Sequence, residues 1–203
     1  QASFRLDGTN HTDSYFQQNQ PFPFPDALQE FSIQTSNYSA AQGASAGAVV
    51  NAVTRSGTNN FHGGAFGYAR DRTFNSKNFF LPERDFLKRK QYGGYSGGPI
   101  MKNKLWFYFT YKYEDNKTYV ASSTYADGSP AYRQSMGNYS GIGRVTWQAS
   151  QKDKVRFYLE KQFNGEFYNG FNTLPTTTPE ASTDAFGRGW VPQLKWTQVT
   201  SDK

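Results

Sequence analysis

From residue 61 onward, apolar and polar residues alternate along segments of strand length. In residues 105–114, Leu, Phe and Tyr occupy the odd positions, whereas Lys112 and Glu114 lie at even positions. A period of two places these two sets on opposite faces of a β-strand. Strands of this kind are predicted at residues 61–70, 92–100, 105–114, 139–149, 155–163 and 190–199. The chain is therefore expected to form an antiparallel sheet with one apolar and one polar face.

The connections between these strands alternate between long and short. Long connections are expected at 71–91, 115–138 and 164–189, and short ones at 101–104 and 150–154. Antiparallel strands joined in this way carry all their long loops at one end, as in outer-membrane barrels. Strands of about ten residues are also long enough to cross a bilayer when tilted. A soluble β-sandwich with one wet face alternates in the same way and stays open as a second interpretation.

Residues 1–60 show a different pattern. Residues 1–8 predict a short strand that ends in an Asp7-Gly8 turn. The loop that follows closes with alternating prolines at positions 21, 23 and 25, which exclude a regular helix or a central strand. A helical turn is expected at 26–30 with Asp26 as its N-cap, and further strands are expected from Phe31 and from Val49.

The composition narrows the class of protein. Aromatic residues make up 18% of the chain and there are 19 glycines, yet the mean hydropathy is −0.79. Rings thus replace the aliphatic residues of an ordinary core, which argues against a helical bundle and a doubly wound α/β enzyme. No apolar run is long enough for a membrane helix. The chain opens without the basic and apolar regions of a signal peptide, so it is interpreted as a mature form or an internal piece.

The sequence offers little catalytic chemistry. It contains no Cys, which excludes disulfides and thiol nucleophiles, and its only two histidines, His11 and His62, lie far apart. No metal site, no cofactor and no catalytic residue is therefore expected. The net charge of +6 is modest, and its basic residues are divided between faces and loops, so nucleic acid is not an expected partner. The basic residues of 71–90 are interpreted as a rim that meets lipid phosphates.

Several motifs resemble a known family. They are Leu6-Asp-Gly8, Pro25-Asp-Ala-Leu-Gln-Glu-Phe31, Tyr38-Ser-Ala-Ala-Gln-Gly43 and Gly47-Ala-Val-Val-Asn-Ala-Val-Thr54-Arg-Ser-Gly-Thr58-Asn-Asn-Phe-His-Gly63. Together they are similar to the second half of the plug domain of TonB-dependent outer-membrane receptors, where the plug passes into the first barrel strand. Gly97-Gly-Pro-Ile100 and Lys104-Leu-Trp-Phe-Tyr-Phe109 resemble the Oar-like or SusC-like branch of that family.

The resemblance implies a fold and a division of the chain. Residues 1–60 would be the C-terminal half of an α+β plug, and residues 61–203 would be the first strands, about six, of an all-β antiparallel transmembrane β-barrel. Such receptors close their barrel with about 22 strands, and six strands cannot enclose a plug. The chain is therefore expected to be a segment of a longer protein.

The resemblance also implies a function. The chain would belong to a receptor in the bacterial outer membrane that takes up an organic nutrient or a metal chelate. Its partners would be a TonB-type energy-coupling protein that acts through a segment absent from this sequence, outer-membrane lipid, a surface lipoprotein and a small organic ligand. It would not be an enzyme. Two alternatives stay open: an outer-membrane adhesion or structural protein that does not transport, and a secreted carbohydrate-binding β-sandwich.

Two sets of residues carry these expectations. The ligand is expected at the outward-facing plug loop, through Asn10, Tyr15, Phe16, Gln17, Phe22 and Phe24. An architectural role in the passage from plug to barrel is expected of Gly43, Gly47, Asn51, Thr54, Ser56, Gly57 and Gly63. The glycines of this second set permit tight turns or close backbone approach.

Overall fold

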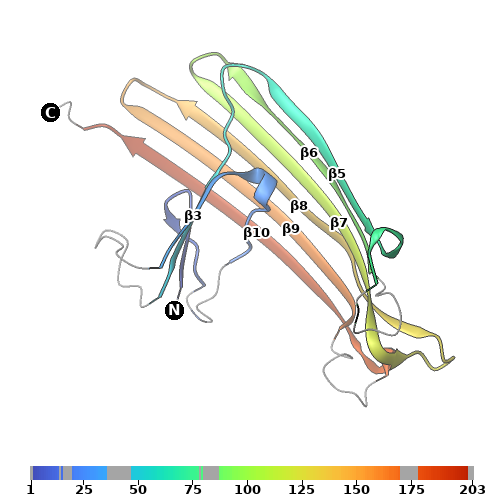
Figure 1. Cartoon of the computed structure of the whole chain (residues 1–203). Coiled ribbons are helices and arrows are strands. Elements are labelled where there is room, and N and C mark those ends of the chain that lie inside the picture. Colours follow the sequence, from blue (N-terminus) through green and yellow to red (C-terminus); the bar gives the residue numbers. More distant parts are fainter. Residues whose placement is uncertain are drawn as a thin grey trace.

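The chain folds into two β-sheets, one of which forms a long curved wall. The structure is a computed structural model and describes residues 2–13, 15, 20–35, 47–77, 79, 87–169 and 178–200. One sheet has four strands and comes from the N-terminal part of the chain, and the other has six strands. Figure 1 shows the six strands running side by side, with the N-terminal sheet against one side of them.

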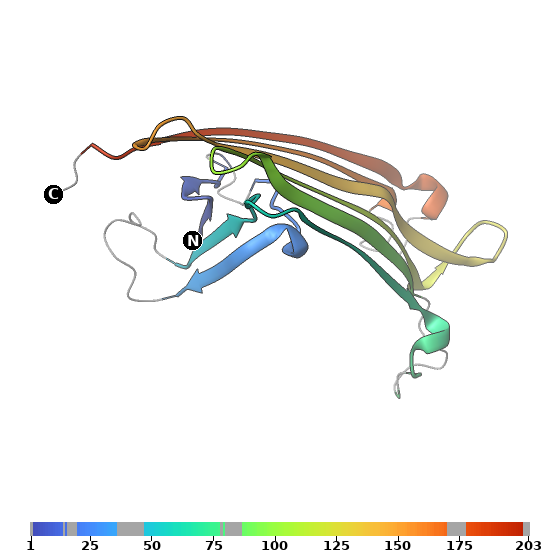
Figure 2. The same ribbon diagram turned by 90° about the horizontal axis from the view of Figure 1, so that it is seen from above.

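The wall is an antiparallel sheet in which each strand pairs with its neighbours in sequence order. Its strands are β5 (His62–Asp71), β6 (Leu87–Met101), β7 (Leu105–Thr124), β8 (Pro130–Gln148), β9 (Asp153–Asn169) and β10 (Thr183–Gln198). This confirms the predicted all-β antiparallel architecture and the position of every predicted wall strand. Seen from above, the wall is bent along its length and leaves one concave side (Figure 2).

Several wall strands are longer than predicted, and one predicted long loop is wrong. The connection between β7 and β8 is a turn at 125–129, because the two strands continue far beyond the expected ends at Glu114 and Tyr139. The ladder there includes the pairs Asn116 with Ser135 and Thr118 with Arg133. These segments lack alternating apolar residues, so the sequence pattern did not predict them as strands. Their backbone groups nevertheless pair. The short turns at 102–104 and 149–152 lie where they were expected.

The N-terminal sheet has the strand order β2-β1-β4-β3. Its strands are β1 (Ser3–Leu6), β2 (Thr9–Asn10), β3 (Leu28–Gln34) and β4 (Val49–Thr54). Strand β1 runs parallel to β4, whereas β3 runs antiparallel to it. The turn between β1 and β2 contains Asp7 and Gly8, both with positive φ, as expected for a Asp-Gly turn.

The expected helical turn at 26–30 is shorter than predicted. A 3₁₀ turn, η1, covers Pro25–Ala27, and Leu28 already pairs with Thr54 on β4. Pairing with an existing strand therefore prevails over the N-cap signal of Asp26. Further 3₁₀ turns are η3 (Arg72–Phe74) and η4 (Pro179–Ala181). No helix in the part of the chain that the structure describes is long and apolar enough to span a membrane.

The N-terminal sheet packs against the concave side of the wall (Figure 2). The shared core joins residues of both sheets: Leu6, Phe24, Ala27 and Ala52 from the N-terminal part, and Ile142, Tyr158 and Val191 from the wall. This apolar core is small for two sheets of this size. Much of the remaining interface is polar, and those polar contacts form the candidate site.

Candidate functional site

The two faces of the wall differ in chemistry. On the concave, inner face, Tyr108, Thr110, Ser140, Arg144 and Glu160 are buried. On the outer face, large aromatic and aliphatic side chains are exposed, whereas Phe107 is partly buried. The exposed ones include Phe109, Tyr111, Val145, Trp147, Phe157, Trp190, Leu194 and Trp196. The predicted split of residues 105–114 into two faces is thus confirmed. It is the polar face, however, that is covered by protein.

Arg144 on β8 joins the wall to two strands of the N-terminal sheet. Its Nη1 atom donates hydrogen bonds to the hydroxyl and the carbonyl oxygen of Thr54, at 2.6 and 2.7 Å, and lies 3.5 Å from a carboxylate oxygen of Asp7. The Thr54 hydroxyl donates in turn to Asp7 at 2.6 Å. The Arg144 and Asp7 side chains are only 8% and 11% exposed. This Arg144 cluster, consisting of Arg144, Asp7 and Thr54, ties the turn after β1 and the end of β4 to the wall.

A second buried group surrounds the carboxylate of Glu160 on β9, which is fully buried. The carboxylate accepts hydrogen bonds from the Tyr158 hydroxyl at 2.6 Å, from the Ser140 hydroxyl at 3.0 Å and from the Gln162 amide. These donors satisfy the charge by hydrogen bonding. Gln162 also donates to the carbonyl oxygen of Phe22 at 3.0 Å, so this group reaches the N-terminal part of the chain as well.

A third contact is made at the edge of the wall by β10. The Lys195 ammonium group donates to the carbonyl oxygen of Asp7 at 3.0 Å. Lys195, Arg144 and Gln162 thus reach the N-terminal part of the chain from three different wall strands. Directional contacts of this kind fix the position of the sheet, and each can be broken separately.

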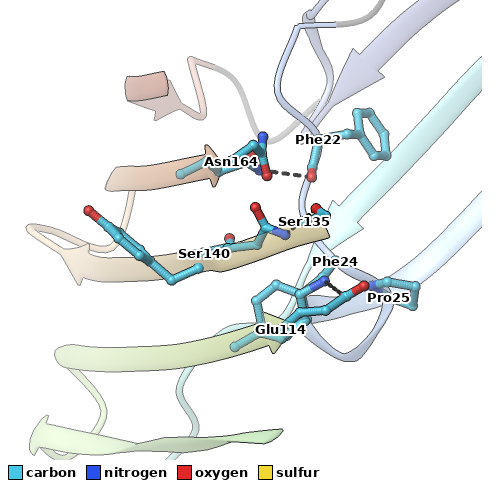
Figure 3. A pocket seen from close by; sticks show the side chains of 11 residues that line it. Phe22, Phe24, Pro25, Glu114, Ser135, Ser140 and Asn164 are labelled. Atoms are coloured by element: carbon cyan, nitrogen blue, oxygen red, sulfur yellow. Dashed lines mark hydrogen bonds and ion pairs between the residues drawn. The ribbon is translucent and has the colours of Figure 1, made fainter. Parts of the chain in front are cut away.

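Above these contacts, on the side of the long connections, the two parts of the chain enclose a hollow of about 330 Å³. Its lining consists of Phe22, Phe24, Pro25, Lys112, Glu114, Ser135, Asn138, Tyr139, Ser140, Gln162 and Asn164. Figure 3 shows the segment from Phe22 to Pro25 on one side, facing strands that carry Glu114, Ser140 and Asn164. The charges at its edge are paired, because Glu114 contacts Lys112 at 3.2 Å and Arg89 at 2.7 Å. The hollow therefore presents mostly hydroxyl and amide groups without an excess of charge.

Two of the predicted ligand residues, Phe22 and Phe24, lie at the hollow. The Phe24 ring is buried, 6.4 Å from the ring of Phe66 and beneath the Lys112 ammonium group at 5.7 Å. The Phe22 ring packs edge-on against Phe4 and His11. In Figure 3 this ring points away from the hollow. Phe22 and Phe24 thus line the hollow while their rings hold the loop to its neighbours.

The other members of the predicted ligand set are more exposed or outside the described residues. Tyr15 is 82% exposed, and the Asn10 side chain accepts a hydrogen bond from the backbone of Thr12. Phe16 and Gln17 lie outside the described residues. The structure therefore brings Phe22 and Phe24 together at the hollow and leaves Asn10 and Tyr15 out of its lining. The ligand role of the set stays a prediction.

The predicted architectural residues lie along β4 and the segment that enters the wall. Asn51 pairs with Arg5 and Ser32 within the N-terminal sheet. Gly57 approaches the wall so closely that an added Cβ atom would lie 2.1 Å from the carbonyl oxygen of Phe107. Gly63 belongs to β5, and Gly47 and Ser56 lie just before and after β4, whereas Gly43 lies outside the described residues. Gly57 thus lies where a close approach of two backbones requires glycine, and an added Cβ atom at Gly63 would lie 2.9 Å from the carbonyl oxygen of Tyr95.

The two histidines lie apart, as the sequence indicated. His11 is buried and its Nε2 atom lies 2.7 Å from the carbonyl oxygen of Pro21, which holds the proline-rich loop in place. His62 stacks on Tyr108 at the inner face of the wall. Among the described residues no group of three or more acidic or histidine side chains is arranged to hold a metal ion.

Sequence reasoning missed that Arg144 joins the wall to the N-terminal sheet and that Glu160 holds Gln162, which reaches Phe22. Arg144 and Glu160 both lie at polar positions of the predicted strands 139–149 and 155–163, where apolar residues alternate with polar ones, so the pattern carried a signal. Arg144 and Thr54 are 90 positions apart, however, and only the folded chain brings them into contact. The basic residues at 88–90 were also assigned to a loop, but they belong to β6. There Arg89 faces inward and pairs with Glu114.

The outer face carries two rows of rings with an apolar band between them. One row, toward the long connections, contains the stacked pairs Tyr92–Tyr113, Tyr139–Phe163 and Phe163–Phe186. The other, near the short turns, contains Trp147 and Trp196. On β7 the distance between the rows corresponds to roughly 20 Å for a tilted strand. We call the outward-facing residues of β7–β10 between these rows the outer band.

An apolar outer band between aromatic rows, together with a polar inner face, defines a transmembrane β-barrel wall. Comparison with known proteins agrees: the chain belongs to the outer membrane β-barrel domain family, whose sequence profile matches residues 53–157. It is therefore a protein of the bacterial outer membrane, as predicted. The β-sandwich interpretation is excluded, because the rings of β7 face outward instead of filling a core.

A curated relative adds a more specific likeness. The chain is similar to the TonB-dependent transporter Oar of Myxococcus xanthus, with 29% identity over 186 residues. The match covers 76% of this chain and 17% of the relative, so the chain corresponds to a small part of that protein's length. This confirms the predicted resemblance to TonB-dependent receptors, for which the Oar-like or SusC-like branch was expected. No solved structure matches the chain.

Proposed function

We propose that the chain is the part of a TonB-dependent receptor in which the plug meets the barrel wall. In this proposal residues 1–60 form the C-terminal half of the plug, and residues 61–203 form the first strands of the barrel. The observation that carries it is the packing of the N-terminal sheet on the polar inner face of an outer-membrane wall, through Arg144, Gln162 and Lys195. The likeness to a TonB-dependent transporter supports it.

The proposed activity is energised uptake of a small organic nutrient or metal chelate. The ligand would enter from the side of the long connections and meet the loop of Asn10, Tyr15, Phe16, Gln17, Phe22 and Phe24 above the hollow. A TonB-type protein would then pull on the plug. Because the polar contacts between plug and wall come from side chains on different wall strands, the plug can be displaced in steps while the wall keeps its ladder of strand hydrogen bonds. No catalytic residue takes part.

Displacement of the N-terminal sheet can be tested without knowing the nutrient. This part of the protein has no cysteine, so a thiol introduced here is the single labelling site once any cysteine elsewhere in the receptor has been replaced. Ala52→Cys places a thiol on β4 where the side chain is fully buried against the wall, and Ala27→Cys does the same at η1. Ala126→Cys, at the exposed tip between β7 and β8, is the matched control.

In energised cells supplied with a complex nutrient mixture, maleimide labelling of Ala52→Cys and Ala27→Cys is expected to be several times faster than in cells without the energy-coupling protein. Labelling of Ala126→Cys should be the same in both. Equal labelling rates at both buried positions, with and without the coupling protein, would contradict energised uptake. Such a result would favour an adhesion or structural role for the same architecture.

A further inference from the structure

Two basic side chains lie on the lipid-facing side of the wall. Lys161 on β9 pairs with Trp190, and Arg188 on β10 pairs with Phe163. The four residues form a block on one face of two neighbouring strands, in which the two cations are diagonal neighbours. Such neighbours lie about 7–8 Å apart, a distance that lets two long side chains converge on one small group.

The surroundings of these cations are aromatic. The Lys161 ammonium group lies 4.8 Å from the Trp190 ring centroid and 5.8 Å from that of Tyr139. Rings at these distances orient an ammonium group but do not neutralise its charge. Lys161 and Arg188 are exposed, and neither forms an ion pair with a carboxylate among the residues that the structure describes.

The pair lies at the edge of the outer band: Lys161 is just inside the aromatic row, and Arg188 is level with Phe163 in that row. Lys161 lies next to the aromatic row at Tyr139 and Phe163, and it is followed along β9, toward the short turn, by the outward residues Leu159 and Phe157. A basic residue facing lipid is increasingly unfavourable toward the middle of the bilayer. Short turns of such barrels face the periplasm, so the pair lies at the level of the outward-facing leaflet.

We propose that Lys161 and Arg188 bind a phosphate group of an anionic lipid in the outward-facing leaflet of the outer membrane. The lipid phosphate supplies the negative charge that the neighbouring side chains lack, and both cations can donate charge-assisted hydrogen bonds to its oxygens. Trp190 and Tyr139 hold the Lys161 ammonium group at that depth. The acyl chains lie along Leu159 and the outward residues beside it. The site requires only that the wall lies in the outer membrane, so it does not depend on the proposed transport activity.

The test compares two double variants of the intact protein in a neutral detergent. Lys161→Gln/Arg188→Gln removes both cations of the site. Lys102→Gln/Lys104→Gln removes the same number of charges from the exposed turn between β6 and β7, at the opposite end of the wall. Binding of bisphosphorylated lipid A and of its enzymatically dephosphorylated product is counted by native mass spectrometry. The shift in gel mobility between unheated and heated barrel confirms that each variant is folded.

The wild-type protein and the turn variant are expected to retain the bisphosphorylated lipid at least about tenfold more tightly than Lys161→Gln/Arg188→Gln. The dephosphorylated lipid should bind all three proteins equally weakly, and a millimolar excess of inorganic phosphate should leave the lipid bound. Equal binding of the bisphosphorylated lipid to all three proteins would overturn the site. So would an equal loss in both double variants, or displacement of the lipid by inorganic phosphate.

Discussion

The inner and outer faces of the wall invert the usual relation between polarity and burial. On the inner face Arg144 and Glu160 are 7% and 0% exposed, whereas on the outer face Phe109 and Phe157 are 51% and 44% exposed. In a protein surrounded by water, the apolar face would be the buried one. Here lipid takes the apolar face, and the protein interior is held by directional polar contacts. A different kind of substitution should therefore destabilise each face: loss of a polar partner on the inner face, and gain of a charge on the outer face.

The largest effect is expected from loss of the Arg144 guanidinium group. Arg144→Met leaves the Asp7 carboxylate and the Thr54 carbonyl oxygen buried without this partner, which destabilises the packing of the N-terminal sheet by about 3–5 kcal/mol. The measurement is the urea concentration at which the N-terminal sheet becomes sensitive to protease. Because Asn tolerates the positive φ of Asp7, the double variant Arg144→Met/Asp7→Asn should lose less than the sum of the two single variants. Strictly additive losses would contradict the Arg144 cluster.

A charge on the outer face should have the next largest effect. Phe157→Arg places a guanidinium group in the outer band and is expected to lower the free energy of folding into lipid vesicles by about 2–4 kcal/mol. Gln151→Arg, in the exposed turn between β8 and β9, adds the same charge outside the band and should change stability by less than about 0.5 kcal/mol. Equal stabilities of the two variants would show that Phe157 does not face lipid.

The difference between the two faces also explains which parts of the wall strands could be predicted from the sequence. Alternation at 105–114 gave the correct faces of β7, because the lipid-facing side must be apolar along the whole band. Beyond Glu114 both faces are polar, so the pattern lost its contrast while the strand hydrogen bonds continued into the pairs Asn116–Ser135 and Thr118–Arg133. Local sequence therefore marks the part of a strand inside the membrane better than the end of the strand.

The contacts of the candidate site were harder to predict for a different reason. Phe22 and Phe24 were predicted to stack on a ligand from the proline-rich loop, but the same residue type also suits packing of the loop against its neighbours. Only the folded chain shows their rings packed on Phe4, His11 and Phe66. An aromatic residue in a loop has the same local signal in both roles, since what distinguishes them is the neighbour that covers the ring.

A smaller effect is expected from two glycines that differ in how closely a neighbouring backbone approaches them. Gly57 runs against the backbone of β7, and a Cβ atom there would meet the carbonyl oxygen of Phe107 at 2.1 Å, so Gly57→Ala is expected to destabilise the protein by about 1–3 kcal/mol. Gly67, on the outer face of β5, has no atom within 4 Å of an added Cβ, and Gly67→Ala should be neutral or slightly stabilising. Urea unfolding of both variants in the same detergent distinguishes them. A neutral Gly57→Ala would show that the segment can move away from the wall.

The smallest effect is expected at Asp71, at the water-exposed end of β5 beyond the outer band, where neither burial nor lipid amplifies a charge. The backbone N–H and the hydroxyl of Thr73 donate to its carboxylate and lower its pKa below the ordinary value of 3.8. Because the folded-state pKa is depressed, the contribution of the ionised carboxylate is complete above about pH 4 and is lost as the pH falls through the folded-state pKa.

Protection of the Thr73 amide from hydrogen exchange, corrected for the intrinsic rate, should therefore decrease in acid, while the amides of the β5–β6 ladder keep their protection. In Asp71→Asn the side-chain oxygen still accepts from Thr73 but no longer titrates, so protection should become independent of pH over the same range. An unchanged acid dependence in this variant would assign the effect to another group.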